Sequence, residues 1–265
     1  QSYFLELDKL YHRLHRGQNV DGTFRRLAQF SMPKTDISKT LRYSTKVPLL
    51  LLGVATSITT NALYGDNNMQ VLITGGTGGI GFAIARQFAA EGHNVVIADL
   101  QQDAIDSKVQ QLRQQGYQAE GIMLDVTDAA SITSCANRFQ VDVLVNNAGI
   151  QHVARLEDFP PEKWAQLINV MLTGPAMLSR AMLPAMRQRN FGRIINIGSI
   201  HALVASPFKS AYVAAKHGLL GFSKVVALEN ADKDITINTI CPAYVKTPLV
   251  ERQIADQAKE HNLTE

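Results

Sequence analysis

From residue 70 onward, short apolar runs alternate with longer segments of mixed polarity. The first run, QVLIT, is followed at once by glycines, and a run of the same kind, NVVIAD, comes 20 residues after it. Short apolar runs bounded by turn residues are typical of buried strands. The pattern predicts strands at 70–74, 94–99, 118–124, 141–146, 192–198 and 234–240.

The segments between these runs have the periodicity of helices. The longest opens with PPEKWAQLINVML at 160–172, where the two prolines suit a first helical turn. Strands that alternate with helices predict a parallel sheet covered on both faces. We therefore expect an α/β fold, a Rossmann-like doubly wound parallel sheet whose C-terminal part is truncated at Glu265. Further helices are predicted at 79–91, 103–115, 128–138 and 209–230.

The first 68 residues follow a different pattern, and we expect them to be an extension of unknown role before a domain at 69–265. LELDKLYHRLHR, near the N-terminus, predicts a short amphipathic helix. The segment 47–64 contains no charged residue, and its length is marginal for a membrane span. Its threonine, serine, asparagine and glycine positions favour a buried hairpin or helix, or poorly structured sequence, over membrane insertion.

Composition and charge restrict the classes of function. The chain is 46% hydrophobic and 18% charged, which is typical of a globular protein. Its net charge of +3 divides into +4 for residues 1–68 and −1 for the remainder, so no basic nucleic-acid groove is expected. Cys135 and Cys241 lie outside any CxxC pattern, so we expect neither a metal site nor a disulfide, and a cytoplasmic location.

The glycine-rich stretch TGGTGGIG, at 74–81, joins the first strand to the first helix. Glycines at such a turn let the backbone approach a pyrophosphate, which the helix N-terminus stabilises, although tight turns also use glycine for packing alone. Asp99 ends the next strand, where a carboxylate can accept hydrogen bonds from an adenosine ribose and repel a 2′-phosphate. The two features predict NAD rather than NADP, unless Asp99 is only a strand-end turn residue.

Tyr212 and Lys216, in KSAYVAAKHG, are one helical turn apart and share a helix face. Such a pair also arises by chance on helix surfaces. A phenol with a pKa of about 10 ionises poorly at neutral pH, and a neighbouring cation favours the phenolate. The pair could therefore be an acid–base device in which Lys216 lowers the pKa of Tyr212.

The spacing T-G-x-x-x-G-x-G at 74–81 resembles the short-chain dehydrogenase/reductase family. Further matches follow in the family's order, and the resemblance covers about residues 70–255. It implies that residues 69–265 are an NAD-binding oxidoreductase domain. The matches are NNAG at 146–149, NV at 169–170, Ser199, and Tyr212-x-x-x-Lys216.

The resemblance also implies roles for individual residues. Tyr212 would be the acid–base group, with Lys216 as its modulator and ribose ligand. Ser199 would orient the substrate carbonyl. Asn169 would hold a relay water, unless it only satisfies a helix kink, and Asp125 would meet the adenine edge rather than cap the next helix. The implied cofactor-binding residues are Gly75, Thr77, Gly79, Ile80, Gly81, Asp99, Asp125, Val126, Asn147, Ala148, Gly149, Tyr212, Lys216, Pro242, Val245 and Thr247.

Within the family, NNAGIQHVA and KSAYVAAKHG resemble segments of the bacterial D-3-hydroxybutyrate dehydrogenases, which interconvert D-3-hydroxybutyrate and acetoacetate with NAD. One cation and several hydrogen-bonding side chains would suit that substrate's carboxylate. Each also has a plainer role, as a loop histidine, a helix-start charge or a surface glutamine. Ala243 and Tyr244 replace the Gly-Trp pair usual in those enzymes, which leaves the pocket shape open. The implied substrate-binding residues are Gln151, Ser199, His201, Lys209, Tyr244 and Gln253.

Two other hypotheses stay open. Another short-chain reductase, such as a 3-oxoacyl thioester reductase, would favour NADP and would need no carboxylate site. A catalytically silent NAD-binding protein would bind cofactor without turnover. The expected partner is a small-molecule substrate rather than a nucleic acid or a membrane. The resemblance implies a homo-tetramer for the full-length chain.

Overall fold

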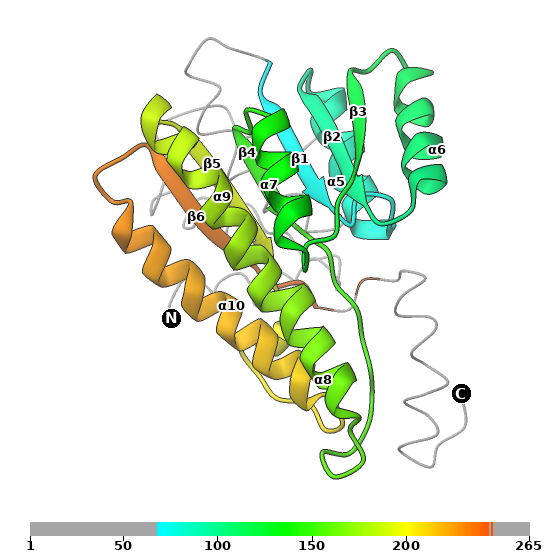
Figure 1. Ribbon diagram of the computed structural model, residues 1–265, viewed down its shortest axis with the longest axis vertical. Coiled ribbons are helices and arrows are strands. Elements are labelled where there is room, and N and C mark those ends of the chain that lie inside the picture. Colours follow the sequence, from blue (N-terminus) through cyan, green and yellow to red (C-terminus); the bar gives the residue numbers. More distant parts are fainter. Residues whose placement is uncertain (1–67, 244, 246–265) are drawn as a thin grey trace, which may run out of the picture. The chain divides into compact units, whose positions relative to one another are not determined.

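The computed structural model describes residues 68–243 and 245 of the chain. In this part, six parallel strands form one sheet in the order β3-β2-β1-β4-β5-β6 (Figure 1). The strand order reverses between β1 and β4, where doubly wound sheets bind their ligands. The predicted strands are confirmed to within two residues at each end. Their bounds are β1 Gln70–Thr74, β2 Asn94–Asp99, β3 Ala119–Met123, β4 Val143–Asn146, β5 Gly192–Ile197 and β6 Ile235–Ile240.

The helices also lie where the periodicity predicts them. The long helix after β4 is divided in the structure, because a π-helical turn interrupts it. Pro161 lies in its first turn, as expected. The helical segments are α5 Gly79–Ala90, α6 Gln102–Arg113, α7 Ala129–Arg138, α8 Pro161–Ile168, the π-helix η2 Asn169–Thr173, α9 Gly174–Arg189, the 3₁₀ turn η3 Ile200–Ala202 and α10 Ser210–Glu229.

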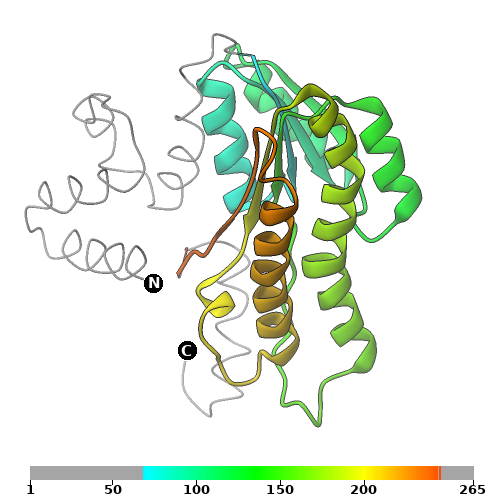
Figure 2. The same ribbon diagram turned by 90° about the vertical axis from the view of Figure 1, so that its left-hand side faces the viewer.

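Helices cover both faces of the sheet, α5 and α6 on one side and α7, α9 and α10 on the other (Figures 1 and 2). Successive strand residues point to opposite faces. Ile73 therefore packs in one buried apolar cluster with Ile84 and Phe88 of α5. Its neighbour Leu72 packs in the other cluster with Leu178 and Met182 of α9. The α/β prediction is confirmed.

A buried polar network crosses the half of the sheet that lies under α9 and α10. The Asn146 side chain donates to Asn196 Oδ1 at 2.8 Å and more weakly to Ser179 Oγ at 3.4 Å. Asn196 Nδ2 donates to Ser223 Oγ at 2.8 Å, and the Ser223 and Thr239 hydroxyls are 2.7 Å apart. Buried polar groups are stable when they are paired in this way. The network joins β4, β5 and β6 to α10.

In the part of the chain that the structure describes, no helix is long and apolar enough to cross a membrane. The uncharged segment 47–64 and the predicted N-terminal helix lie outside the described residues. The division of the chain at residue 68 therefore stays a prediction.

Candidate active site

The glycine-rich turn after β1 is packed too tightly for larger residues. Gly75 has a φ of +61°, and a Cβ there would lie 3.0 Å from Ala148 Cα. A Cβ on Gly81 would lie 2.2 Å from the Gly75 carbonyl oxygen. Glycine is required at both positions, by conformation at Gly75 and by space at Gly81. The start of α5 is thereby held against the ends of β1 and β4.

The same turn fits the pyrophosphate of a dinucleotide. Helix α5 begins at Gly79 with no side-chain cap and no acidic residue in its first turn. A Cβ on Gly78 would have no closer neighbour than the Gly75 carbonyl oxygen, at 3.6 Å, so the turn is open there. The N–H groups of a first helical turn have no helical acceptor and attract anions. Thr77 and Ile80 flank this opening, both half-buried.

The Asp99 carboxylate, at the end of β2, is held by the glycine-rich turn. One oxygen accepts the Thr77 N–H at 3.1 Å and also the Thr77 hydroxyl. The other oxygen accepts the Leu100 N–H at 2.8 Å. A carboxylate has about four acceptor positions, so capacity remains for a ribose hydroxyl. Asp99 is thus more than an isolated turn residue, and its chemistry fits the adenosine end of a dinucleotide.

Asn147 and Thr74 join the end of β4 to the glycine-rich turn. Asn147 Nδ2 donates to the carbonyl oxygens of Thr74 and Gly75 at 3.0 and 3.1 Å. The Thr74 hydroxyl accepts the N–H groups of Asn147 and Ala148, both at 3.0 Å. A Cβ on Gly149 would make only ordinary contacts, the nearest with Met171 Sδ at 3.6 Å. The predicted cofactor residues of β1 and β4 therefore converge at the switch point.

Asp125 organises the loop after β3. It accepts both the N–H and the hydroxyl of Thr127, at 2.8 and 2.7 Å. The cap of α7 is Asp128, which accepts the Ser131 N–H at 2.7 Å. Asp125 is exposed and does not cap the helix, as expected, and Val126 is buried beside it. Contact of Asp125 with an adenine stays a prediction.

Three of the predicted site residues converge around the Tyr212 side chain. Ser199, which follows β5, makes a side-chain hydrogen bond to Tyr212. Lys216 Nζ lies 5.7 Å from the centroid of the Tyr212 ring and donates to the Ile197 carbonyl at 2.7 Å. The His201 ring meets the Tyr212 ring edge-on, with centroids 6.1 Å apart. This arrangement places a phenol, a hydroxyl, an imidazole and an ammonium together at the carboxyl end of β5.

Burial has the largest effect on the pKa values of Tyr212 and Lys216. It raises the pKa of Tyr212, and the hydrogen bond with Ser199 lowers it in part. Burial also lowers the pKa of Lys216 to about 8. Burial therefore decides the net direction of the pKa of Tyr212, and the role of Lys216 as its modulator stays a prediction. Both side chains are withdrawn from water, which disfavours both charged forms.

Asn169 begins the π-helix η2, where its carbonyl accepts the Gly174 N–H. Single π-helical turns inside α-helices recur at functional sites. Helix α10 packs closely on this turn, since a Cβ on Gly218 would lie 2.8 Å from Leu172 Cδ2. The expectation of a helix irregularity at Asn169 is confirmed. Its role in holding a water stays a prediction.

The candidate carboxylate ligands Lys209 and His201 are both buried. Lys209 is 5% exposed, and in the described part of the chain no acidic group or hydrogen-bond acceptor pairs with its ammonium. Burial lowers its pKa. His201 is 8% exposed, and its Nδ1 has no hydrogen-bond partner among the described residues. Burial, and then the charge of Lys209, lower the pKa of His201, which keeps it neutral.

The remaining predicted residues are less informative. Gln151 is half-buried in the loop after β4, where its Oε1 accepts the His152 N–H at 3.3 Å. The Pro242 carbonyl accepts the Ile200 N–H at 2.7 Å, which ties the end of β6 to η3. Val245 is half-buried. The predicted residues that lie outside the described residues are Tyr244, Thr247 and Gln253.

Residues 69–258 match the family model for short chain dehydrogenases. The chain belongs to this family. Two D-beta-hydroxybutyrate dehydrogenases are similar to it, from Cupriavidus necator at 45% identity (74% of this chain, 78% of that protein) and Rhizobium meliloti at 47% (73% and 78%). The 3-oxoacyl-(acyl-carrier-protein) reductase of Escherichia coli is 37% identical (70% and 77%). A crystal structure of an actinorhodin polyketide ketoreductase with NADPH matches with a TM-score of 0.72 and 31% identity, over 74% of this chain and 78% of that one.

Two contributions to this short-chain dehydrogenase site carry no recognisable sequence signal. The hydrogen bond between Asn196 and Ser223, part of the buried network, attaches α10 to β5. Cys241 follows β6 beside the site, where its thiol has a pKa raised by burial. Serine and asparagine within apolar runs resemble ordinary solvent-facing positions until the packing is known.

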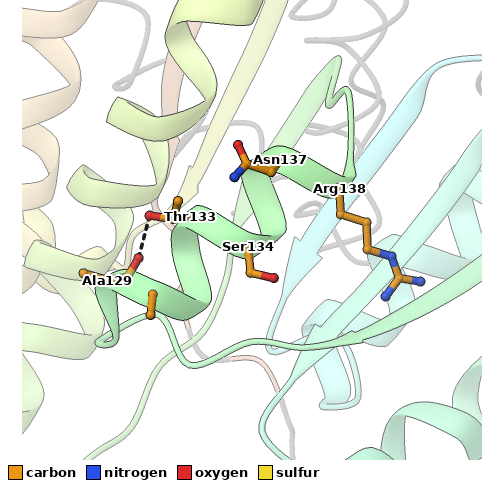
Figure 3. A pocket seen from close by; sticks show the side chains of 6 residues that line it. Ala129, Thr133, Ser134, Asn137 and Arg138 are labelled. Atoms are coloured by element: carbon orange, nitrogen blue, oxygen red, sulfur yellow. Dashed lines mark hydrogen bonds between the residues drawn. The ribbon is translucent and has the colours of Figure 1, made fainter.

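One surface hollow is on α7, away from all of the predicted site residues (Figure 3). Only one helix lines it, with short polar and small side chains. Figure 3 shows that Thr133 bonds back to its own helix at the Ala129 carbonyl, 2.8 Å away. The lining residues are Ala129, Ala130, Thr133, Ser134, Asn137 and Arg138. The hollow has no role in the arrangement around Tyr212.

Proposed function

We propose that this short-chain dehydrogenase interconverts D-3-hydroxybutyrate and acetoacetate with NAD. The observation that carries the proposal is Lys209, three residues before Tyr212, whose side chain is largely buried and forms no ion pair with any of the described residues. An ammonium that is largely withdrawn from water is stabilised when an anion pairs with it. A carboxylate on the substrate would supply that anion. The similarity to two D-beta-hydroxybutyrate dehydrogenases supports the same substrate.

The site also offers neutral hydrogen-bond donors beside the cation. Within residues 68–243, the Nδ1 of His201 has no partner, and the pKa of His201 is lowered, so the neutral ring can donate a hydrogen bond without adding charge. Gln151 lies in the loop after β4 and supplies a half-buried amide. A cation with neutral donors selects a small anion over a neutral ketone.

In this proposal, the chain's own residues bind the ligands and move one proton. The glycine-rich turn and Asp99 hold the dinucleotide, which supplies or accepts the hydride when it is bound. Ser199 donates to the carbonyl oxygen of the substrate, and the Tyr212 hydroxyl gives that oxygen its proton during reduction. Lys216 is protonated below about pH 8 and favours the transient phenolate. Asn169 keeps its proposed role as the holder of a relay water.

The preference for NAD over NADP rests on Asp99. Its carboxylate is fixed by Thr77 and Leu100 at the end of β2, where the adenosine ribose binds in this fold. A 2′-phosphate would meet that charge directly, and Gly78 in the adjacent turn offers no cation to offset it. We therefore propose that NADP is the poorer cofactor.

A 3-oxoacyl thioester reductase is the alternative, and the 37% identity to the Escherichia coli enzyme favours it as a second candidate. A thioester has no carboxylate at the position that Lys209 would fill. The proposed substrate and the alternative therefore differ in one charge, which makes them separable by kinetics.

The deciding experiment compares acetoacetate with its neutral methyl ester in wild type and in Lys209→Met. Loss of a hydrogen-bonded ion pair should raise the KM for acetoacetate roughly 10- to 100-fold and leave the ester unaffected. Lys224→Met, at an exposed position of the same helix, is the matched control. An unchanged KM for acetoacetate in Lys209→Met would exclude the proposed substrate. Better turnover of an acetoacetyl thioester would favour the alternative.

We also propose the homo-tetramer and the cytoplasmic location that the family resemblance implies. Met177 on α9, and Val225 and Leu228 on α10, are apolar side chains with exposed fractions of 41%, 54% and 79%. Exposed apolar side chains of this kind suit contact with another copy of the chain. Cys135 and Cys241 are both free thiols, which accords with a reducing compartment. Light scattering on the full-length chain would measure the assembly.

A further inference from the structure

Phe208, immediately before Lys209, has a left-handed backbone with a φ of +63°. The other non-glycine residue with a positive φ in the described part of the chain is Asn190, at the end of α9. Asparagine adopts this conformation readily, whereas a bulky aromatic residue does so only when its surroundings impose it. Such outliers persist where the surrounding structure fixes them, and they cluster at functional sites.

At least two contacts hold Phe208 in this conformation. Its carbonyl accepts the Ala154 N–H at 3.0 Å, and the Arg155 guanidinium lies 5.7 Å from the centroid of its ring. Both contacts come from the loop after β4. Ala154 is buried in an apolar cluster with Ala211 and Ala215 of α10. The loop is therefore anchored on the helix whose start it helps to fix.

The conformation of Phe208 determines where α10 begins. Lys209 is the N-cap of this helix, and its carbonyl accepts the Val213 N–H at 2.8 Å. The turn at Phe208 brings the chain from the exposed Pro207 to the buried Lys209. Without that turn, the Lys209 side chain would not be directed inward beside His201.

We propose that Phe208 is a positioning residue that holds Lys209 in the orientation required for binding the substrate carboxylate. This inference rests on the proposed function. It assigns the specificity for an anionic substrate to a pair of residues, of which only Lys209 contacts the substrate. Phe208 acts through the backbone and through its contacts with Ala154 and Arg155.

The test is a double-mutant cycle between Phe208→Gly and Lys209→Met, with acetoacetate and its methyl ester as substrates. Glycine adopts either hand of backbone, so Phe208→Gly removes both the constraint and the ring contact. We expect it to raise the KM for acetoacetate about tenfold, with kcat and the KM for the ester nearly unchanged. In the Lys209→Met background it should have no further effect, because interacting positions are not additive.

The controls separate positioning from general damage to the fold. Asn190→Gly, at the other left-handed position, should leave both KM values unchanged. Phe208→Asn retains a residue that tolerates the left-handed region, so it should raise the KM for acetoacetate less than Phe208→Gly does. If Phe208→Gly does not fold, the same cycle is run with Phe208→Asn. The increase in the KM for acetoacetate that Phe208→Asn causes should again be absent when Lys209→Met is also present.

Two results would overturn the inference. An equal increase of the KM in both backgrounds would mean that Phe208 has only a general structural role. No increase in the wild-type background, while Lys209→Met does weaken acetoacetate, would exclude Phe208 and leave the proposed function intact. If Lys209→Met itself has no effect, the proposed function and this inference both fail.

Discussion

Thr77 and Asp99 are 22 residues apart, and the N–H and the hydroxyl of Thr77 both donate to the same oxygen of Asp99. The glycine-rich turn and the end of β2 are thereby one unit. The carboxylate that would receive the ribose is oriented before any ligand arrives. A preoriented acceptor loses less entropy on binding than a free one.

Thr77→Val should weaken the binding of NAD without affecting the substrate. It keeps the N–H donor and removes the hydroxyl, so we expect the KM for NAD to rise roughly 3- to 10-fold, the effect of one charge-assisted hydrogen bond. Asp99→Asn should raise it further and improve the use of NADP. The measurement is kcat/KM with both cofactors, and Thr133→Val on the exposed face of α7 is the control. Efficiency with NADP that equals or exceeds NAD in wild type would contradict the role of Asp99.

Tyr212→Phe should abolish most of the turnover while the fold persists. Loss of a general acid–base group costs about 10²- to 10⁴-fold in kcat. Phenylalanine keeps the ring that packs against His201, so the midpoint of thermal unfolding should change little. Steady-state kinetics and calorimetry on the same preparation provide the two measurements. Near-normal turnover would remove Tyr212 from the mechanism.

Lys216 should destabilise the folded chain below about pH 8, and this effect should diminish at higher pH. Its pKa is about 8 in the folded chain against 10.5 as the ordinary value, so the unfolded chain binds the additional proton between these two values. The free energy of unfolding therefore rises with pH in that window, by on the order of 3 kcal/mol for this group. Lys216→Met lacks the titration. From pH 8 to pH 10, the free energy of unfolding should therefore rise more for wild type than for Lys216→Met. If it depends on pH in the same way in both proteins, the lowered pKa of Lys216 is contradicted.

Ser223→Ala should lower the free energy of unfolding, because Ser223 belongs to the buried polar network that joins α10 to the sheet. The Ser223 hydroxyl accepts from Asn196 and is paired with Thr239, so its removal leaves a buried amide without its acceptor. An unsatisfied buried donor costs about 1 to 3 kcal/mol. Urea unfolding would measure the change, with Ser134→Ala on the exposed face of α7 as the control. An equal, small change in both variants would show that the network contributes little.

The strands and most helices were predictable because their signals are local. Apolar runs and glycine turns fixed the six strands of the described part, and the family spacing brought Ser199, Tyr212 and Lys216 together correctly. The π-helical turn at Asn169 was expected only as a kink, since one extra residue per turn hardly changes the apolar periodicity of a helix.

The ionisation of the site and the backbone at Phe208 could not be predicted. Sequence proximity indicates that Lys216 and Tyr212 are neighbours, but it does not give the burial that raises the pKa of the phenol. The left-handed Phe208 contradicts the ordinary preference of phenylalanine, and its carbonyl accepts a hydrogen bond from Ala154, in a different loop. Both are tertiary effects that override local preference.

Helix α10 carries Lys209 at its start, and Tyr212 and Lys216 on its next two turns. The proposed substrate anchor, proton donor and modulating cation are therefore parts of one rigid body. A rotation or shift of α10 would displace all three together, so improved fit to a new substrate would come at the expense of proton transfer. A change of substrate is easier in the loops after β4 and after β5, at positions other than Ala154, Ser199 and His201, because those other positions can vary without displacing the helix. Directed evolution toward other ketones should therefore accumulate substitutions in those loops and leave the helix unaltered.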